Sequence, residues 1–406
     1  MTLKKDITSA LTVSFLTIAA GAAFGVWTGV GSSLGILSMV VASIMGVFFG
    51  GVSVKTSGPT GPTAGLMYTG ILMITAAGYS IQAYWFVLMV SAVIIFILSY
   101  FPVEKLLNHI PYVSIAVFVN GMSFFILHKQ LLKVIDFSSL EVSSHIWETS
   151  IVFGAVILLF LWPKISKIIR FLPGSSIFSG SLFVMFIGSA ANYVLAPDVN
   201  SISIDEIVLS NLMTHITSIF IAPEISLYLA TLLVFKTVFI LFLVTTITAK
   251  ALDKNANFSS ELKNQGVANF AVALIGGIPV TIGFIRTKLL QRSGGSSLLA
   301  GILTGVFVLL IAVYMSDALE LIPSSVFVGI LIKAGLSSFD WQVFTDYKKG
   351  NGSLVAILFV LTGTMLVLWQ DLAFIFIGSI CVWYLINRIP FLKEKCIDIK
   401  TCPCAG

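Results

Sequence analysis

Long apolar runs, separated by short polar or Gly/Pro-rich stretches, fill most of this sequence. A membrane-spanning helix needs about 20 mainly apolar residues, and most of the runs approach or exceed that length. The pattern predicts an all-α polytopic membrane protein with about fourteen transmembrane segments. The predicted apolar segments are Ile7–Thr28, Ser33–Phe49, Thr60–Ala77, Tyr84–Tyr100, Tyr112–Leu127, Ile151–Leu161, Ser176–Val194, Leu227–Thr248, Val267–Ile275, Val280–Leu290, Leu298–Tyr314, Ile322–Ile332, Leu354–Trp369 and Leu372–Ile386.

Two of these segments, the third and the tenth, are short and begin in glycine and proline. The third opens with residues 57–63 (SGPTGPT) and the tenth with residues 276–283 (GGIPVTIG). Proline suits the first helical turn, and irregular backbone at membrane depth survives only where protein buries it or a cavity exposes it. Broken helices at corresponding places in two halves indicate a transporter with inverted repeats, although two ordinary loops would carry similar residues. Two facing helix N-termini would favour an anion.

Charge is scarce, since 10% of the residues are Asp, Glu, Lys or Arg, against roughly a quarter in soluble domains. This excludes a soluble, disordered or disulfide-scaffold protein. Most basic residues fall in loops that would be cytoplasmic if the N-terminus were inside, so both termini are predicted to be cytoplasmic in a cell-membrane protein. The basic segment 162–170 (WPKISKIIR) is predicted as a separate interfacial amphipathic helix on that side.

The segments divide into a first seven-segment repeat over 1–200, an outside connection over 201–226, a second repeat over 227–390 and a cytoplasmic tail over 391–406. Three of the four cysteines (Cys396, Cys402 and Cys404) lie in that tail, and their role stays open. Their spacing is not that of an ordinary zinc site. No metal site and no cofactor is predicted.

Arg286 is the sharpest candidate from the residues alone, because it follows the opening of the tenth segment. An ionisable residue at membrane depth costs a few kcal/mol or more and indicates function, although a structural partner is the alternative. Lys333 follows a helix end and is predicted to extend to the interface. Lys236 lies deeper, and a structural or pathway role is left open. No predicted segment contains Asp or Glu, which favours anion exchange or weak cation coupling.

Several motifs carry a family resemblance. The first segment opens with residues 6–13 (DITSALTV), and Ser57-Gly58-Pro59-Thr60 opens the third. The most specific stretch begins at residues 261–269 (ELKNQGVAN) and continues through 276–279 (GGIP), Arg286-Thr287, 293–295 (SGG), 299–301 (LAG) and Ile322-Pro323. In these residues the chain resembles the SulP sulfate permease family, from about Asp6 to Trp341.

The resemblance implies seven-plus-seven inverted repeats, with core and gate domains in a homodimer. It implies elevator-type secondary transport of an anion of the sulfate, bicarbonate, chloride or dicarboxylate class across the bilayer. The substrate would lie between the N-termini of the third and tenth helices, against the first and eighth. The implied substrate-binding residues are Phe24, Ser57, Gly58, Thr60, Val244, Thr245, Thr281, Gly283, Ile285, Arg286 and Thr287.

Three departures from the family pattern affect this expectation. Ala20 stands where the family often has Gln, and Val244 stands where many bacterial members have a carboxylate, which puts Na+ or H+ coupling in doubt. The regulatory STAS domain is expected to be absent after the last segment. Coupling to a counter-anion or Na+ is therefore left open, and no nucleic-acid partner is expected.

Other functions stay open on this sequence. An anion channel-like conductor, or a carrier of a small neutral or cationic organic solute, would use the same fold, although Arg286 argues against a cation. A membrane enzyme would need clustered His, Asp, Glu or Cys at one membrane face, and no such cluster is evident. The identity of the anion is not predicted.

Overall fold

The computed structural model describes residues 2–102, 110–136, 142–169, 180–195, 225–253, 255–349, 354–367, 372–386 and 388. The chain divides into two compact units, each described here by itself. Unit 1 comprises Met1–Phe101 and Leu132–Lys333, and unit 2 comprises Pro102–Leu131 and Ala334–Gly406. The predicted outside connection, up to residue 224, and the predicted tail 391–406 lie outside the described residues.

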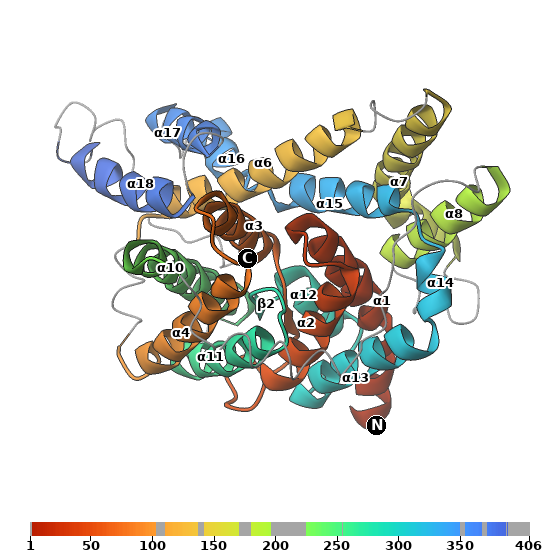
Figure 1. The fold of residues 1–406 in the computed structure, drawn as a ribbon, viewed down its shortest axis with the longest axis horizontal. Helices are drawn as coiled ribbons and strands as arrows, with labels where there is room; N and C mark the ends of the chain where they lie inside the picture. The colour runs from red at the N-terminus through yellow and green to blue at the C-terminus, as the bar shows by residue number, and fades with distance from the viewer. Residues whose placement is uncertain are drawn as a thin grey trace. The chain divides into compact units, whose positions relative to one another are not determined.

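Helices form almost all of the described chain (Figure 1). The helices that lie wholly in unit 1 are α1 (Thr2–Thr28), α2 (Ser32–Met45), α3 (Gly61–Ala76), α4 (Gln82–Leu98), α7 (Val142–Ile169), α8 (Gly180–Leu195), α10 (Leu227–Leu252), α11 (Phe258–Leu274), α12 (Phe284–Arg292), α13 (Leu298–Tyr314) and α14 (Ser316–Glu320). Two helices, α6 (Tyr112–Asp136) and α15 (Ser324–Ser338), contain the chain positions at which the units change, and α16 (Gln342–Lys348), α17 (Leu354–Leu366) and α18 (Leu372–Ile386) belong to unit 2.

The described part of the chain contains four helices long and apolar enough to cross a membrane. They span Leu3–Thr28, Tyr112–Ile135, Ile146–Ile168 and Leu227–Leu252, and the bent pair α15–α16 is a fifth candidate. Several further helices of 10–17 residues are equally apolar. The chain is therefore a multi-pass membrane protein, while the count of about fourteen segments stays a prediction.

One predicted boundary was wrong. The basic segment after Leu161 does not form a separate interfacial helix, because α7 continues through Pro163 to Ile169. A proline inside a membrane helix is tolerated where neighbouring groups satisfy the freed backbone. Apolar Ile165 and Ile168, three positions apart, lie on one side of the helix, which keeps an apolar stripe over these turns.

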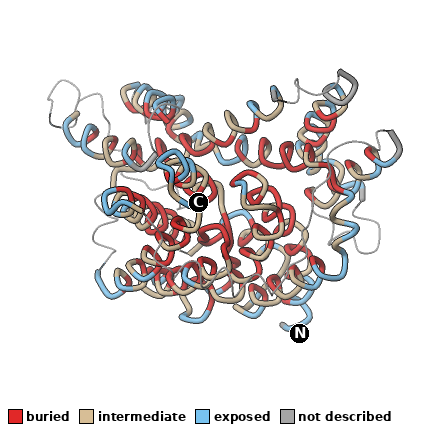
Figure 2. The backbone as a smooth tube through the Cα atoms, in the orientation of Figure 1, coloured by how far each residue is buried: buried red, intermediate tan, exposed pale blue. Residues whose placement is uncertain are grey.

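Glycines let the first two helices of unit 1 pack backbone against backbone. A Cβ added to Gly35 would lie 2.1 Å from the carbonyl oxygen of Gly21, and one added to Gly25 would lie 2.1 Å from that of Gly31. Close approach through small residues is typical of helix packing in membranes. Helix α13 packs on both α1 and α2, while α4, α10 and α11 pack on one another. Figure 2 shows that the buried positions follow the inward faces of these helices.

Unit 2 has an apolar core of its own. Buried Val113 and Val117 of α6 pack with Val343 of α16, Val360 of α17 and Trp383 of α18. The core holds together helices that come from two distant parts of the sequence.

Candidate functional site

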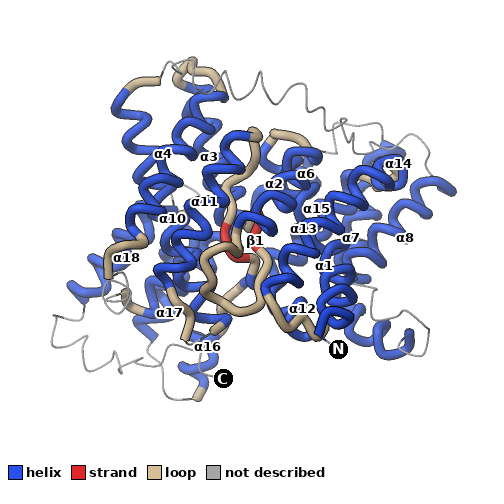
Figure 3. The backbone as a smooth tube through the Cα atoms, turned by 90° about the horizontal axis from the view of Figure 1, so that it is seen from below, coloured by secondary structure: helices blue, strands red, loops and turns tan. Residues whose placement is uncertain are grey.

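Two very short strands join the two halves of the sequence inside unit 1. Strand β1 (Ser57–Gly58) pairs antiparallel with β2 (Thr281–Ile282), with Ser57 opposite Ile282 and Gly58 opposite Thr281. Figure 3 shows the strands in red, with the loop segments that lead to them in tan. We call this pair of strands the strand crossing. Helix α3 begins three residues after β1, and α12 begins two residues after β2.

The prediction of two helices that begin at irregular backbone is confirmed. The tenth begins at Phe284 rather than Val280, because the intervening residues form β2 and the Gly283 cap. The Gly283 N–H donates to the carbonyl of Thr56 at 3.0 Å, which ties the start of α12 to the entry of β1. Thr60 caps α3, and its Oγ1 lies 3.1 Å from Oγ1 of Thr281. The unpaired N–H groups of two helix N-termini give this region a positive potential.

Arg286 is buried beside the strand crossing. The residue is 6% exposed, and its Nη1 donates to the carbonyl of Pro59, between β1 and α3, at 3.1 Å. Its Nε and Nη2 are buried and have no hydrogen-bond partner in the part of the chain that the structure describes. A guanidinium offers five N–H donors, so most of its bonding capacity remains for a ligand. Burying a charge without a partner is costly, which makes a bound anion the natural complement.

Glycines on both sides make room for that guanidinium. A Cβ on Gly58 would lie 2.9 Å from Nη2 of Arg286, and a Cβ on Gly283 would lie 2.6 Å from the same atom. Both distances are too short for real contacts. The predicted site residues Gly58 and Gly283 therefore define the space in which the charge sits.

Ser57 and Thr287, also predicted as site residues, form hydrogen bonds within the protein. The Oγ of Ser57 accepts from Nε2 of Gln265 at 3.0 Å. The Oγ1 of Thr287 accepts from the Thr56 N–H at 3.1 Å and donates to the Thr56 carbonyl at 3.3 Å. These hydrogen bonds stabilise the strand crossing, and a contact of either side chain with a substrate stays a prediction.

The remaining predicted residues lie on neighbouring elements. Val244 and Thr245 are buried on α10, which packs on β2 and α12, and the Thr245 hydroxyl has no partner among the described residues. Phe24 is buried on α1, which packs on α3 and α12, and its ring centroid lies 6.2 Å from that of Trp27. Ile285 is 51% exposed on the first turn of α12 and points in a different direction from buried Arg286.

The predicted apolar segments contain no carboxylate, but several helices extend beyond these segments and carry Asp or Glu in the added turns. Asp6 lies in the first turns of α1 and accepts from Ser296 and Ser297 at the start of α13. Glu148 lies in α7 and is 1% exposed. Glu261 lies in the first turn of α11 and is completely buried.

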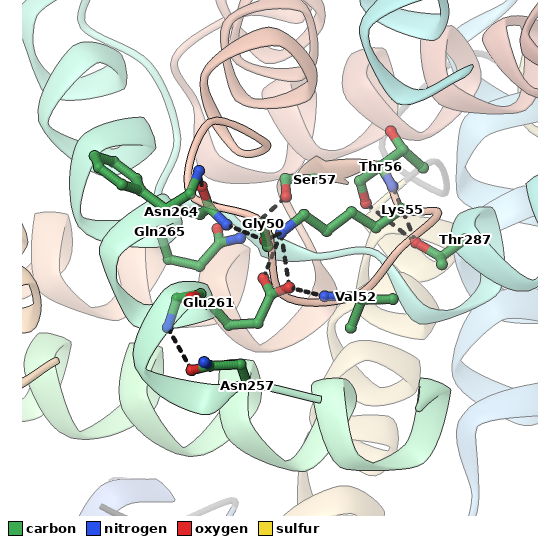
Figure 4. A network of polar contacts seen from close by, with 12 residues as sticks. Gly50, Val52, Lys55, Thr56, Ser57, Asn257, Glu261, Asn264, Gln265 and Thr287 are labelled. Atoms are coloured by element: carbon green, nitrogen blue, oxygen red, sulfur yellow. Dashed lines mark hydrogen bonds and ion pairs between the residues drawn. The ribbon is translucent and has the colours of Figure 1, made fainter. Parts of the chain in front are cut away.

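Glu261 forms a buried ion pair that sequence reasoning missed. Nζ of Lys55 lies 2.7 Å from both carboxylate oxygens, and neither side chain is exposed (Figure 4). The same carboxylate accepts from the N–H of Val52 at 2.5 Å, and Lys55 also donates to the carbonyl of Gly50. Lys55 thus has its partner 206 residues away along the chain.

Lys333 and Lys236, the two lysines discussed with the sequence, each have a close side-chain neighbour. Nζ of Lys333 lies 3.9 Å from the centroid of the Phe160 ring, a cation–π contact, and its extension to the interface stays a prediction. Lys236 is buried on α10 with its Nζ 3.5 Å from the sulfur of Met73. Among the described residues, no group of three or more His, Cys, Asp or Glu is placed to hold a metal ion.

Comparison with known proteins identifies the family. The model of the sulfate permease family matches residues 3–361. YbaR of Bacillus subtilis, named as a sulfate transporter, is 22% identical over 371 residues, which cover 89% of this chain and 72% of that protein. The bicarbonate transporter BicA of Picosynechococcus sp. is 24% identical over 361 residues, 84% of this chain and 62% of BicA.

Solved structures share the fold. The transmembrane domain of a cyanobacterial bicarbonate transporter BicA superimposes with a TM-score of 0.70 at 20% identity, over 93% of this chain and 97% of that one. Murine solute carrier 26 family member A9, an anion transporter in the inward-facing state, gives 0.72 at 12% identity, over 95% and 68%. These relatives are transporters rather than enzymes. The chain, with its two broken helices and buried Arg286, belongs to the sulfate permease family of membrane transport proteins.

Proposed function

We propose that this protein is a secondary transporter that binds a small anion between the N-termini of α3 and α12 and exchanges it across the membrane. The observation that carries the proposal is Arg286, a 94%-buried guanidinium with Nε and Nη2 unpaired within the described residues. Two helix N-termini next to it add to its positive potential. Sulfate, bicarbonate, chloride and dicarboxylates all fit this electrostatic requirement, and an elevator-type movement in a homodimer follows the family pattern.

The test is anion binding and uptake by purified protein in proteoliposomes, with Arg286→Met and Arg286→Lys compared with the unaltered chain. Losing a hydrogen bond to a charged group costs about 1.5–3 kcal/mol, so Arg286→Met should weaken binding about 10–100-fold. Arg286→Lys keeps the charge but loses the planar fork, so its affinity should fall in between. Lys288→Gln removes the same charge from a partly exposed position on the same helix and is the matched control. Unaltered affinity in a correctly inserted Arg286→Met protein refutes the site.

We propose that uptake of one anion is driven by exchange for another. The argument rests on the partners of two buried carboxylates rather than on an absence of carboxylates. Asp6 accepts hydrogen bonds from serines of α13, and Glu261 is paired with Lys55, so both groups are occupied. Uptake driven by trans anion, and unaffected by an imposed proton or Na+ gradient, is the expected result. Gradient-driven uptake without a counter-anion contradicts it, and loss of that uptake in Glu148→Gln would then identify the group responsible.

A channel-like conductor is the second candidate, because the same positive site would conduct anions if its access were continuous. A carrier shows flux that saturates with anion concentration and is accelerated by anion on the other side. Flux that rises linearly and shows no trans-acceleration would favour the channel. Transport of a neutral or cationic solute in the same screen would point away from Arg286 as the recognition group.

A further inference from the structure

One face of α11 carries four polar side chains that are completely buried. Glu261, Asn264, Gln265 and Asn269 stand at spacings of three, one and four residues, so they share one side of the helix, and each is 0% exposed. Buried polar groups are costly unless they are hydrogen-bonded. Their partners show what this face of the helix does.

Three of these side chains bind the segment that leads into β1 and α3. Asn264 accepts from the Phe49 N–H at 2.8 Å through Oδ1 and donates to the Gly50 carbonyl at 2.7 Å through Nδ2. Glu261 binds the same segment through Lys55, and Gln265 donates to Ser57 in β1 itself (Figure 4). The long entry between α2 and α3 is therefore bonded to α11 rather than to its own repeat alone.

The fourth side chain binds the entry to β2 and α12. Asn269 accepts from the Val280 N–H at 2.8 Å and donates to the Val280 carbonyl at 2.8 Å. Val280 immediately precedes β2. Asn269 thus makes on one entry the same paired amide-to-backbone contact that Asn264 makes on the other, five positions away along α11.

A strand pair of two residues on each side forms too few hydrogen bonds to fix its own register. We propose that the polar face of α11 (Glu261, Asn264, Gln265 and Asn269) is the positioning element that aligns the two half-helix N-termini around Arg286 and so sets the affinity of the site. This inference rests on the proposed function. These four residues do not contact the anion in this proposal. They hold in place the backbone segments from which the site is built.

The first test compares Asn264→Ala with Asn269→Ala, each of which releases one entry only. Asn269→Ala removes the partner of the Val280 N–H and carbonyl, and Asn264→Ala removes the partner of the Phe49 N–H and one of the two donors to the Gly50 carbonyl. Each entry should therefore shift, and the anion Kd should rise about tenfold, with a smaller change in maximal transport rate. Lys263→Ala is the matched control, because Lys263 is half-buried on another face of α11, over the ring of Tyr100. Its Kd should not change.

A second measurement reports the alignment directly. Thr60→Cys with Thr281→Cys, in a chain whose native cysteines are changed to serine, places two thiols where the hydroxyl oxygens lie 3.1 Å apart. Oxidative cross-linking should be rapid in this chain, slower by about tenfold when Asn264→Ala or Asn269→Ala is added, and unchanged with Lys263→Ala. A global loss of stability that leaves the strand crossing in register would not slow it.

Unchanged Kd and unchanged cross-linking in folded Asn264→Ala and Asn269→Ala proteins would overturn the inference. If either protein cannot be purified, Asn264→Asp and Asn269→Asp keep the acceptor oxygen, lose the donor, and are judged by the same two measurements. Failure of the proposed function looks different: the unaltered chain would bind no anion, while the cross-linking series would still report on α11. Arg286→Met should lose affinity without slowing the cross-link.

Discussion

Removing the charge of Lys55 should destabilise the protein far more than removing both charges of its ion pair. Lys55→Met leaves the carboxylate of Glu261 completely buried, with the Val52 N–H as its remaining hydrogen-bond donor. Breaking a buried pair by deleting one partner costs about 3–5 kcal/mol, because the other charge stays in a medium that cannot solvate it. The Gly50 carbonyl also loses its bond from Nζ.

The double variant Lys55→Met/Glu261→Gln carries no charge at this place. The glutamine oxygen still accepts from Val52, so the expected cost is one or two neutral hydrogen bonds, or about 1–2 kcal/mol. The double variant should therefore be about 2–3 kcal/mol more stable than Lys55→Met alone. The second substitution should thus restore a large part of the stability that the first removes.

The assay is the free energy of unfolding of purified protein in mixed micelles titrated with a denaturing detergent, for the unaltered chain, both single variants and the double variant. Binding of the anion at saturation gives an independent check that each protein is folded. The prediction fails if a single variant loses less than about 1 kcal/mol of unfolding free energy. It also fails if the double variant loses the sum of the two single losses, because each charge would then not depend on the other for its burial.

Three further outcomes follow from named contacts. Gly51→Ala should destabilise the protein more than Gly50→Ala in the same unfolding assay. Both glycines have positive φ, but only at Gly51 would the new Cβ lie 2.0 Å from a carboxylate oxygen of Glu261. Equal losses of stability would contradict this prediction. Asp6→Ala should cost about 1–2 kcal/mol, because it removes the acceptors for the serines at the start of α13, whereas Asp6→Asn should cost less; the unfolding titration ranks them. Glu148→Gln should keep or raise the thermal midpoint, because the carboxylate of Glu148 is buried without an ion-pair partner among the described residues. The same change at Glu261 removes one charge of an ion pair and should lower the midpoint, and a fall at both positions would contradict the difference.

The broken helices could be predicted from the sequence because their signals are local. Proline and glycine before α3 and α12 act on the backbone within a few residues, and Arg286 stands out because it closely follows the opening of the tenth predicted segment. The structure adds the reason for the glycines: Gly58 and Gly283 leave space for the guanidinium. Ile285, next to Arg286, shows the limit of this reasoning, since adjacent residues on a helix face different directions.

The ion pair could not be predicted in the same way, because its partners are distant in sequence. Glu261 occurs in a polar stretch (ELKNQ) that resembles a loop or an exposed first turn, and nothing local shows that this turn is buried. The strands of two residues are too short to produce an alternating pattern. The apolar run found in the sequence begins at Val267, nine residues after α11 begins, because polar residues buried in protein have the same sequence signature as polar residues in water.

The separation of Lys55 and Glu261 has a consequence for how the protein is made. A ribosome releases Lys55 more than 200 residues before its partner, so the nascent first half enters the membrane with an uncompensated ammonium group and an entry segment that lacks its bonds to α11. That half cannot complete its own structure until α11 has been synthesised. We therefore expect residues 1–200 expressed alone to be degraded, and co-expression of residues 201–406 as a separate chain to rescue them.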